Sequence, residues 1–344
     1  MSPRVGIVVI GRNEGERLVR CLGSLPAGLP AVYVDSGSTD GSAAAALGLG
    51  AAVVELDLSK PFTAARARNT GLSSLMANHP GVGLVQFVDG DCELDNGWIE
   101  AGAAFLAREG RAGGVFGRLR ERFPERSLYN RLCDLEWDEA PVGEVRACGG
   151  IVMMRAAALS EVGGFREDLI AGEEPELCVR LRERGWGIHR IDAEMALHDA
   201  AMTRFGQWWR RAVRAGHAGA EGAWLHGRGR DRHGVRTVAS ALVWGLGLPV
   251  AAVAAAVVTG GWSLLALLLY PLQWARLTAR ESRRGRKGVA GRYAALLLVS
   301  KFAHVTGIGR FLVGRLSHRP PTLIEHKAAQ APQSAVGTPA GGRV

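Results

Sequence analysis

The first third of the chain alternates short apolar runs with amphipathic stretches. The runs Val5–Ile10, Ala31–Asp35, Ala52–Leu56 and Gly83–Asp89 have the length and composition of buried strands. The stretches between and after them have helical spacing: Glu14–Leu25, Thr39–Leu49, Phe62–Ala77 and Asn96–Arg108. This regular alternation predicts an α/β fold, a mostly parallel sheet with helices on both faces.

The pattern is looser from Arg111 to Asp199, where paired glycines interrupt it, and the clearest element there is a helix over Glu174–Arg184. The stretch Thr203–Leu225 then mixes three tryptophans with four arginines just before an apolar segment. Such a mixture is typical of a helix that lies in the membrane interface. The alternative is an amphipathic helix that packs on the sheet.

Two apolar stretches near the C-terminus predict a membrane hairpin. Val238–Val258 carries no charge and is long enough to cross the hydrocarbon core. Gly260 and Gly261 form a turn, and Trp262–Ala275 runs back as a shorter apolar segment that contains Pro271. We therefore expect a pair of helices that enters and leaves the membrane from the same side.

A third apolar stretch, Tyr293–Val313, differs from the hairpin because it carries Lys301 and Arg310. A charge near the middle of a bilayer is costly. We therefore expect an in-plane helix here, with a third membrane span as the alternative. From about Pro320 the chain is rich in Ala, Pro and Gly, a composition that predicts disorder.

The formal net charge of +9 is concentrated around these apolar stretches. Arg276–Lys287 contains six basic residues, and the loop before the hairpin is also rich in arginine. Basic residues at both ends of a hairpin place both ends on the cytoplasmic side. They indicate a membrane as the partner and not a nucleic acid, since no nucleic-acid-binding motif accompanies them.

Five widely spaced cysteines show no metal or redox spacing and predict reduced, cytosolic thiols. The first apolar run is too short for a signal peptide. We expect an enzyme of the cell inner membrane with a cytoplasmic catalytic domain. The predicted organisation is a catalytic domain over 1–202, an interfacial helix and basic linker over 203–234, membrane helices over 235–316 and a disordered tail over 317–344.

Acidic turns follow two of the predicted strands. Asp35 ends the second strand within Val34–Gly41, and Asp89 and Asp91 follow the fourth. The carboxyl ends of the strands in such sheets form the ligand site. Each turn alone is more simply a capped strand–helix joint or an ordinary acidic turn. Together, with Arg68 between them, they predict one acidic site suited to Mg²⁺ or Mn²⁺ and a diphosphate.

The order of these motifs resembles family 2 glycosyltransferases, which have the GT-A fold. The resemblance covers about residues 4–200. The matching motifs are Arg12-Asn13-Glu14, Val34 to Asp40, Ala67 to Gly71, Asp89 to Asp91, Gly149-Gly150, Gly163 to Glu167 and Glu173-Glu174-Pro175-Glu176-Leu177. The resemblance implies a doubly wound mixed sheet that binds a nucleotide sugar, followed here by C-terminal membrane helices. It also implies a UDP sugar as the favoured donor and transfer with inversion.

The same resemblance implies a role for several residues. Asp35 would hold the base, and Asn13, Glu14 and Arg68 would complete the nucleotide-sugar site. Asp89 would lie near the ribose and the metal. The metal ligands would be Asp91, Asp89 and His198. Glu174 would take the proton from the acceptor hydroxyl, with Glu173 as the alternative base.

The resemblance places Gly149, Gly150 and Glu176 on the acceptor side. Gln207–Arg211 resembles the Gln-x-x-Arg-Trp motif of processive membrane synthases and adds Trp209 and Arg210 to that side. Arginine replaces the final tryptophan of that motif, so a single transfer is favoured over polymer synthesis. A membrane enzyme of this kind suits cell-envelope or glycolipid biosynthesis with a lipid-linked acceptor.

Two other functions are compatible with such a sheet. A sugar nucleotidyltransferase would need a Gly-rich basic loop after the first strand, and Gly11–Glu14 does not provide one. A membrane-bound nucleotide-sugar-binding protein without turnover would retain the fold, but intact Asp35, Asp89 and Asp91 favour an enzyme.

Overall fold

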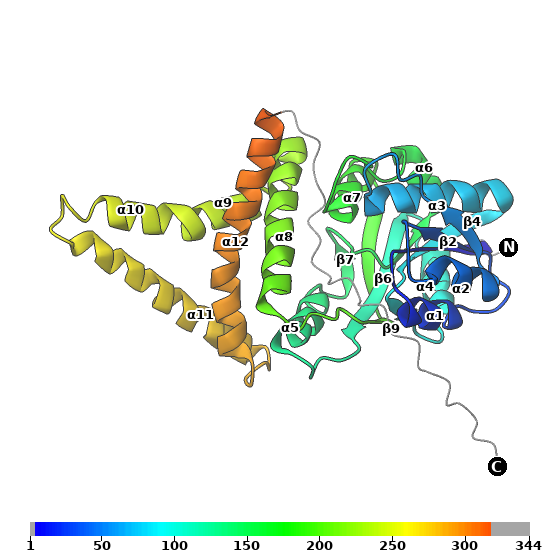
Figure 1. The fold of residues 1–344 in the computed structure, drawn as a ribbon, viewed down its shortest axis with the longest axis horizontal. Helices are drawn as coiled ribbons and strands as arrows, with labels where there is room; N and C mark the ends of the chain where they lie inside the picture. The colour runs from blue at the N-terminus through cyan, green and yellow to red at the C-terminus, as the bar shows by residue number, and fades with distance from the viewer. Residues whose placement is uncertain (1–3, 318–344) are drawn as a thin grey trace, which may run out of the picture.

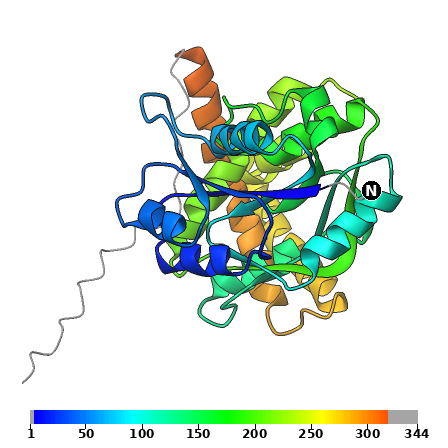
Figure 2. The ribbon, with the colours of Figure 1, turned by 90° about the vertical axis from the view of Figure 1, so that its right-hand side faces the viewer.

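A computed structural model describes residues 4–317 of the 344-residue chain. Its α/β part contains a nine-stranded mixed sheet in the order β3-β2-β1-β4-β8-β6-β9-β5, with β7 paired to β9. Helices cover both faces of this sheet, and a separate group of helices lies to one side (Figures 1 and 2). The predicted C-terminal tail lies outside the described residues, except for Ser317.

The four strands predicted from the apolar runs are confirmed. They are β1 (Arg4–Gly11), β2 (Ala31–Asp35), β3 (Ala52–Glu55) and β4 (Val82–Asp89), and their neighbours pair in parallel. The side chains of β1 from Val5 to Ile10 are buried. Burial on both faces explains why this strand is a continuous apolar run and not an alternating one.

The other half of the sheet is more complex than the sequence pattern indicated. Its strands are β5 (Cys92–Leu94), β6 (Ala112–Glu121), β7 (Gly143–Val145), β8 (Val152–Arg155) and β9 (Gly187–His198). Strand β8 runs antiparallel to both of its neighbours, while β9 runs parallel to β6 and antiparallel to β5. This half makes the sheet mixed, as the family resemblance implied.

Six helices pack around the sheet near their predicted positions or in the region of looser pattern. They are α1 (Glu16–Gly23), α2 (Ser42–Gly48), α3 (Ala64–Asn78), α4 (Trp98–Arg108), α6 (Ala156–Val162) and α7 (Glu173–Glu183). A seventh, α5 (Leu128–Trp137), faces the C-terminal helices. Helix α3 lies very close to β1 and β2, because Gly71 has no side chain to separate them from it.

Helix α8 (Phe205–His226) lies between the α/β part and α12 (Ala290–Leu316). Trp208 is buried against Cys133 and Met202, while Trp224 is exposed. One face of α8 packs against protein, and small residues on that face allow α12 to approach closely, while Phe205, Arg210 and Trp224 stay exposed. Whether the exposed side of α8 lies in the membrane interface stays a prediction.

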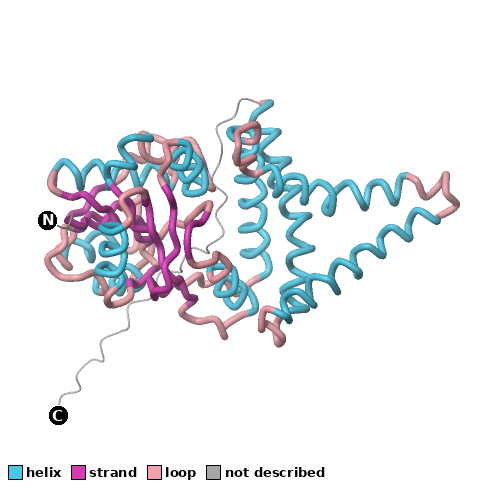
Figure 3. The backbone as a smooth tube through the Cα atoms, turned by 180° about the vertical axis from the view of Figure 1, so that it is seen from behind, coloured by secondary structure: helices cyan, strands magenta, loops and turns pink. Residues whose placement is uncertain are grey.

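The predicted hairpin projects away from the α8–α12 pair (Figures 1 and 3). Its first arm is α9 (Val235–Leu242), a π-helical segment (Val243–Gly247) and α10 (Leu248–Ala254). Its second arm is a 3-10 segment (Trp262–Leu268) followed by α11 (Leu269–Arg283). Val257 and Val258 at the tip are 91% and 90% exposed, an arrangement that water disfavours.

Two helices are long and apolar enough to cross a membrane, by length and composition alone: Val235–Ala254 and Ala290–Leu316. The first contains the first arm of the hairpin, and the second contains the stretch that the sequence predicts to lie in the plane of the membrane. About a third of the apolar window in α12 is buried within the protein. Whether α12 lies in the plane or crosses therefore stays a prediction.

Both ends of the hairpin are attached to the α/β part. Before the first arm, Asp231 forms an ion pair with Arg182 of α7. After the second arm, the guanidinium of Arg286 lies 3.1 Å from the carboxylate of Glu139, just beyond α5, and also donates to the carbonyl of Leu135. The two ends therefore lie on the same side of the projecting helices.

The close approach of α3 to the sheet gives a stability prediction. A Cβ at Gly71 would overlap the side chain of Val8 and lie 2.9 Å from Cγ2 of Val34. We expect Gly71→Ala to lower the free energy of unfolding by about 1–3 kcal/mol, as overpacking typically does. Denaturant unfolding of the purified full chain in detergent would measure this.

Gly23→Ala is the matched control, since Gly23 ends a helix and has open space around its Cα. Alanine is the better helix former there, so this variant should be as stable as the wild type or slightly more so. Equal stability of the two variants would contradict the packing argument.

Candidate active site

The carboxyl ends of three parallel strands bring the predicted acidic residues together. In the register of the sheet, Gly11 of β1 pairs with Asp35 on one side, and the preceding Ile10 pairs with Asp89 on the other. Asp35 and Asp89 therefore lie on the same edge, on either side of β1. This is the arrangement expected from a site at strand carboxyl ends.

Asp35 is buried and fixed by its own turn. Its carboxylate accepts from the hydroxyl of Tyr33 at 2.9 Å and from the amides of Gly37 and Ser38 at 3.0 and 2.8 Å. Burial, followed by the charge of Asp35, raises the pKa of Tyr33 well above its usual range, so the phenol stays a donor. Three of the roughly four acceptor positions of the carboxylate are filled, which leaves room for one further donor.

The Asn13-Glu14 turn is attached to this acidic turn. The side-chain oxygen of Asn13 accepts from the backbone amide of Thr39 at 2.8 Å, and the backbone amide of Asn13 donates to the hydroxyl of Ser38. Asn13 adopts a positive φ of 55°, which asparagine tolerates better than most residues. Glu14 is buried and lies 2.7 Å from the guanidinium of Arg17.

A buried arginine joins three carboxylates at the same edge. The guanidinium of Arg68 lies 3.0 Å from the carboxylate of Asp89 and 2.9 Å from those of Glu173 and Glu174. We call these four residues the Arg68 cluster. Burial alone would lower the pKa of Arg68, but the charges of Glu174, Asp89 and Glu173 outweigh this and raise it, so the guanidinium stays charged.

Glu174 is the member of the cluster with a strongly shifted acidity. Burial raises the pKa of Glu174 to about 7, the nearby charge of Glu173 adds to the shift, and Arg68 opposes it. A carboxyl group with this pKa can accept and release a proton near neutral pH. Helix α7 begins at Glu173, one residue earlier than the predicted helix, and so presents both glutamates in its first turn.

Gly150 lies directly over the Arg68 cluster. A Cβ there would overlap the guanidinium of Arg68 and lie 3.0 Å from Asp89 and 3.1 Å from Glu174. Any side chain at this position would displace a member of the cluster. Its neighbour Gly149 has open space beside it, and the two glycines thus leave the cluster accessible.

Asp91 faces a different partner from Asp89. Its Oδ2 lies 3.0 Å from Nε2 of His198, whose ring packs on Trp137 with the centroids 4.5 Å apart. The pairing of β5 with β9 places Cys92 opposite His198. Asp91, Cys92 and His198 each offer one atom that could bind a metal, and these atoms lie within 4.8 Å of one another.

The structure gives two motif residues a role that the sequence did not reveal. Asn69 accepts from the amide of Phe165 and donates to its carbonyl and to Glu167, so it holds the Gly-Gly-Phe turn. Gly164 adopts a positive φ of 72° directly against this side chain. The sequence offered one indication, since Arg68-Asn69 and Gly163–Glu167 both belong to the family-like motifs. It did not indicate that the side chain of Asn69 contacts the Gly163–Glu167 turn.

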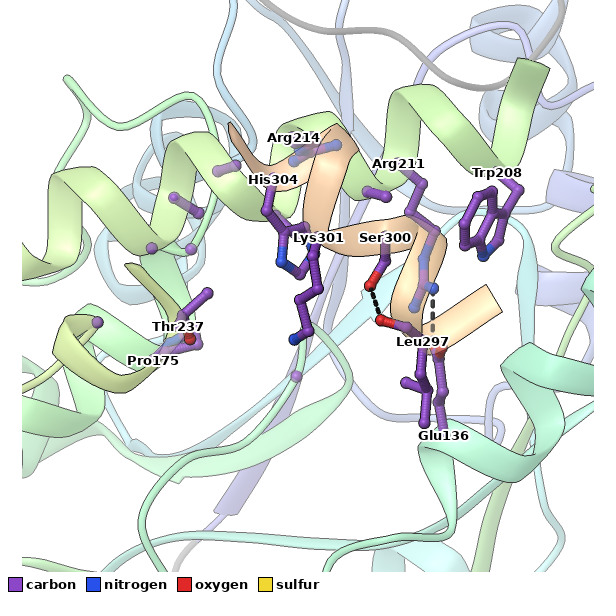
Figure 4. Close-up of a pocket in the computed structure, with 18 of the residues that line it drawn as sticks. Glu136, Pro175, Trp208, Arg211, Arg214, Thr237, Leu297, Ser300, Lys301 and His304 are labelled. Atoms are coloured by element: carbon purple, nitrogen blue, oxygen red, sulfur yellow. Dashed lines mark hydrogen bonds and ion pairs between the residues drawn. The ribbon is translucent and has the colours of Figure 1, made fainter. Parts of the chain in front are cut away.

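A cavity of about 710 Å³ begins at Gly149 and Glu174 and extends between α8, α9 and α12 (Figure 4). We call it the helix cavity. The predicted acceptor-side residues Trp209 and Arg210 do not line it, whereas Trp208 and Arg211 do. Trp208, Arg211 and Ala212 share one face of α8, since helical neighbours recur every three to four residues. Trp209 and Arg210 point elsewhere.

Glu176, also predicted on the acceptor side, faces away from the Arg68 cluster. It is 1% exposed, and its carboxylate lies 2.8 Å from Arg180 and 2.9 Å from His226 at the end of α8. The residue thus joins α7 to α8, and its acidic side chain is already compensated.

The thiols of Cys148 and Cys178 lie 3.5 Å apart beside the cluster, a contact that their wide spacing in the sequence did not indicate. All five cysteines are buried and free.

Comparisons with known proteins support the same interpretation of the fold. Residues 6–163 match the family model described as Glycosyl transferase family 2. The chain is 23% identical over 255 residues to Glycosyltransferase AglE of Haloferax volcanii, a match that covers 70% of this chain and 80% of the relative. It is 28% identical over 250 residues to the Pre-mycofactocin glycosyltransferase of Mycobacterium tuberculosis, covering 64% of this chain and 48% of that protein.

Among solved structures, the chain is similar to the mannosyltransferase PcManGT from Pyrobaculum calidifontis, in complex with GDP-Man and Mn²⁺. The TM-score is 0.57 at 19% identity, and the match covers 91% of this chain and 88% of the other. This likeness confirms the predicted GT-A fold. The family match spans most of the strands that carry the acidic edge, and together with the glycosyltransferase relatives it shows that this chain is similar to the glycosyltransferases of family 2.

Proposed function

We propose that this glycosyltransferase transfers a sugar from a nucleotide-diphosphate donor to an acceptor hydroxyl with inversion, in cell-envelope or glycolipid biosynthesis. The observation that carries the proposal is the Arg68 cluster. It places a carboxyl group with a pKa near 7, Glu174, beside a buried arginine and the Asp89 turn. A proton acceptor and a diphosphate-binding cation thus share one site.

The donor would lie along the edge between Asp35 and Asp89. Asp35 keeps one acceptor position for a base N–H or a ribose hydroxyl, and Asp89 is half-exposed beside it. The similar PcManGT structure is a complex with GDP-Man, which supports a nucleotide-sugar donor here. We keep a UDP sugar as the proposed donor, because Asp35 can accept from the imide N–H of uracil.

The residues present fit a divalent metal. Asp91 and His198 supply carboxylate and imidazole ligands, and their 3.0 Å separation is close to the distance between adjacent ligands at bonds of about 2.1 Å. Asp89 would be the third protein ligand. Carboxylate and imidazole suit Mn²⁺, and carboxylate suits Mg²⁺. When bound, such an ion supplies positive charge that stabilises the departing diphosphate.

In this proposal Glu174 acts as the base. The acceptor hydroxyl oxygen forms a bond to the anomeric carbon as the bond from that carbon to the diphosphate oxygen breaks, and the hydroxyl proton passes to the Glu174 carboxylate. Attack opposite the leaving group inverts the anomeric configuration. Arg68 holds Glu174 in place and can also bind the diphosphate, since a guanidinium fits phosphate oxygens well.

We also propose that the hairpin anchors the enzyme to the cell inner membrane, with the α/β part in the cytoplasm. The exposed apolar tip and the attachment of both hairpin ends to the α/β part support this. The basic segment Arg276–Lys287 follows the second arm and would remain on the cytoplasmic side. In this view α12 lies in the plane of the membrane.

Metal-dependent donor binding predicts the effect of Asp91→Asn. The amide keeps the shape of the carboxylate and can still bond to His198, but it removes the negative charge. We expect Mn²⁺-dependent binding of UDP to be lost, as measured by calorimetric titration, while thermal unfolding without ligands stays close to wild type.

Asp95→Asn is the control, since Asp95 is an exposed acidic residue just after β5. It should bind UDP as the wild type does. Retention of full Mn²⁺-dependent binding by Asp91→Asn would rule out Asp91 as a metal ligand.

The proposed base predicts both a rate loss and a pH profile. Glu174→Gln should bind donor normally and lose about 10²–10⁴-fold in transfer rate, the usual contribution of a positioned base. In the wild type, kcat should fall as the pH drops below about 7, because protonation removes the acceptor of the proton. The variant should lack this dependence. The readout is nucleotide diphosphate release with acceptor present.

Three further variants locate the base. Glu173→Gln and Glu176→Gln should lose less activity than Glu174→Gln, and Glu183→Gln at the end of the same helix should lose almost none. A larger loss in Glu173→Gln with intact donor binding would assign the base to Glu173. A loss below about tenfold in all of them would place the base elsewhere.

The hairpin topology predicts the labelling of single cysteines in intact cells. Thr259→Cys at the tip should react with a membrane-impermeant thiol reagent from outside, whereas Gly288→Cys after the second arm should react only after the cells are opened. The buried native thiols keep the background low. Protection of the tip in intact cells would mean that the hairpin does not cross, and external labelling of Gly288→Cys would refute it altogether.

A further inference from the structure

The helix cavity connects the proposed base with the apolar helices. Glu174 and Gly149 line one end, while α8, α9 and α12 form most of the remaining wall, together with Leu132 and Glu136 of α5. Two of the described helices are long and apolar enough to cross a membrane: Val235–Ala254, which begins with α9, and α12. A ligand in this cavity can therefore touch the catalytic carboxylate and apolar helices at the same time.

Three cations line this cavity, Arg211, Arg214 and Lys301, and the last two have no counter-ion among residues 4–317. Arg211 is compensated, since its guanidinium lies 2.6 Å from the carboxylate of Glu136. In the part of the chain that the structure describes, the side chains of Arg214 and Lys301 have no ion pair or hydrogen bond. Glu174, the other acidic residue of the wall, is already paired with Arg68. The cavity thus carries two uncompensated positive charges.

The backbone that carries Lys301 is fixed by close helix packing. Figure 4 shows Lys301 extending from α12 into the cavity, with His304 one turn further along the helix. The backbone of α12 at these residues is in tight contact with Gly245 of the first hairpin arm and Gly216 of α8. Nδ1 of His304 is buried and has no partner among the described residues.

Uncompensated charge in a mostly apolar surrounding is costly unless an opposite charge binds there. Lys301 and Arg310 are the residues that make a membrane crossing of this stretch unfavourable, and the structure directs Lys301 into the cavity. A phosphate group carries between one and two negative charges near neutral pH and accepts several hydrogen bonds. Its charge is therefore opposite to that of Arg214 and Lys301, and its oxygens can accept hydrogen bonds from both side chains.

We propose that the helix cavity is the acceptor site and takes an amphiphile with a phosphate group, whose phosphate contacts Arg214 and Lys301. Its hydroxyl-bearing head reaches Glu174, and its apolar chain leaves along α9 and α12. The phosphate is the binding group and not the nucleophile. This rests on the proposed function in assigning the hydroxyl to Glu174, but phosphate binding itself does not require turnover.

Binding of simple probes to the full chain in an uncharged detergent tests the proposal. The probes are dodecyl phosphate, dodecanol and inorganic phosphate, each titrated against thermal unfolding, because a ligand that binds the folded state raises the melting temperature. Dodecyl phosphate should stabilise the wild type at lower concentration than inorganic phosphate, and dodecanol should give no saturable shift. Equal effects of dodecyl phosphate and dodecanol would refute phosphate recognition.

An inorganic phosphate response equal to that of dodecyl phosphate would refute the amphiphile, because the site would then bind a free anion. The variants Lys301→Gln and Arg214→Gln should each weaken dodecyl phosphate binding about tenfold or more, as expected for loss of a charged hydrogen-bond donor. Arg292→Gln is the matched control, an exposed arginine on α12 outside the cavity. It should bind within about twofold of wild type.

A like loss in Arg292→Gln would mean that bulk charge and not the cavity attracts the probe, and would overturn the proposal. UDP titration with Mn²⁺ on the same samples separates this proposal from the proposed function. Loss of dodecyl phosphate binding with intact UDP binding is the expected result for Lys301→Gln. If the wild type binds dodecyl phosphate but never UDP, the donor assignment fails while the cavity assignment stands.

Discussion

A charged arginine in the interior requires compensation, and this requirement organises the active site. Arg68 is 2% exposed, and an uncompensated guanidinium at such a depth would cost several kcal/mol. Asp89, Glu173 and Glu174 supply the compensation from two separate elements, the end of β4 and the start of α7. The ion pairs thus join α3, the sheet edge and α7. Removing any one partner would leave a buried charge, so the three elements hold one another in place.

The first half of the fold was predictable because its signals are local. Strands β1, β2 and β4 are largely buried and are nearly continuous apolar runs bounded by turn residues, while β3, at the edge of the sheet, is only partly buried. Residues a few positions apart therefore identify these strands. The second half depends on pairing between distant segments. Strand β9 runs beside β6 and β5 although the sequence shows only a short strand-like stretch, Gly187–Ile191. Its extension to His198, which creates the contact with Asp91, is set by its neighbours.

The site was predictable to the same degree. Residue type and position at a strand end were enough to select Asp35, Asp89 and Asp91, because the carboxyl ends of parallel strands share one edge. Partners were not predictable. Arg68 was expected near the diphosphate. No local sequence pattern indicates that its guanidinium is buried and paired with three carboxylates. On α8 the motif indicated Trp209 and Arg210, whereas packing of the helix turns Trp208 and Arg211 toward the helix cavity.

The position of the helices suggests why the enzyme has a hairpin at all. A simple membrane anchor requires only an apolar segment and a linker. It does not need to contact the edge of the sheet that carries the candidate site. Here α8 and α12 form a wall of the cavity that contains Glu174, and Gly216 allows the two helices to approach closely. Arg286 and Asp231 fix both ends of the hairpin to the α/β part. Under the proposed function, helices placed by so many specific contacts would determine where an acceptor can approach Glu174, so membrane association and acceptor selection would depend on the same wall.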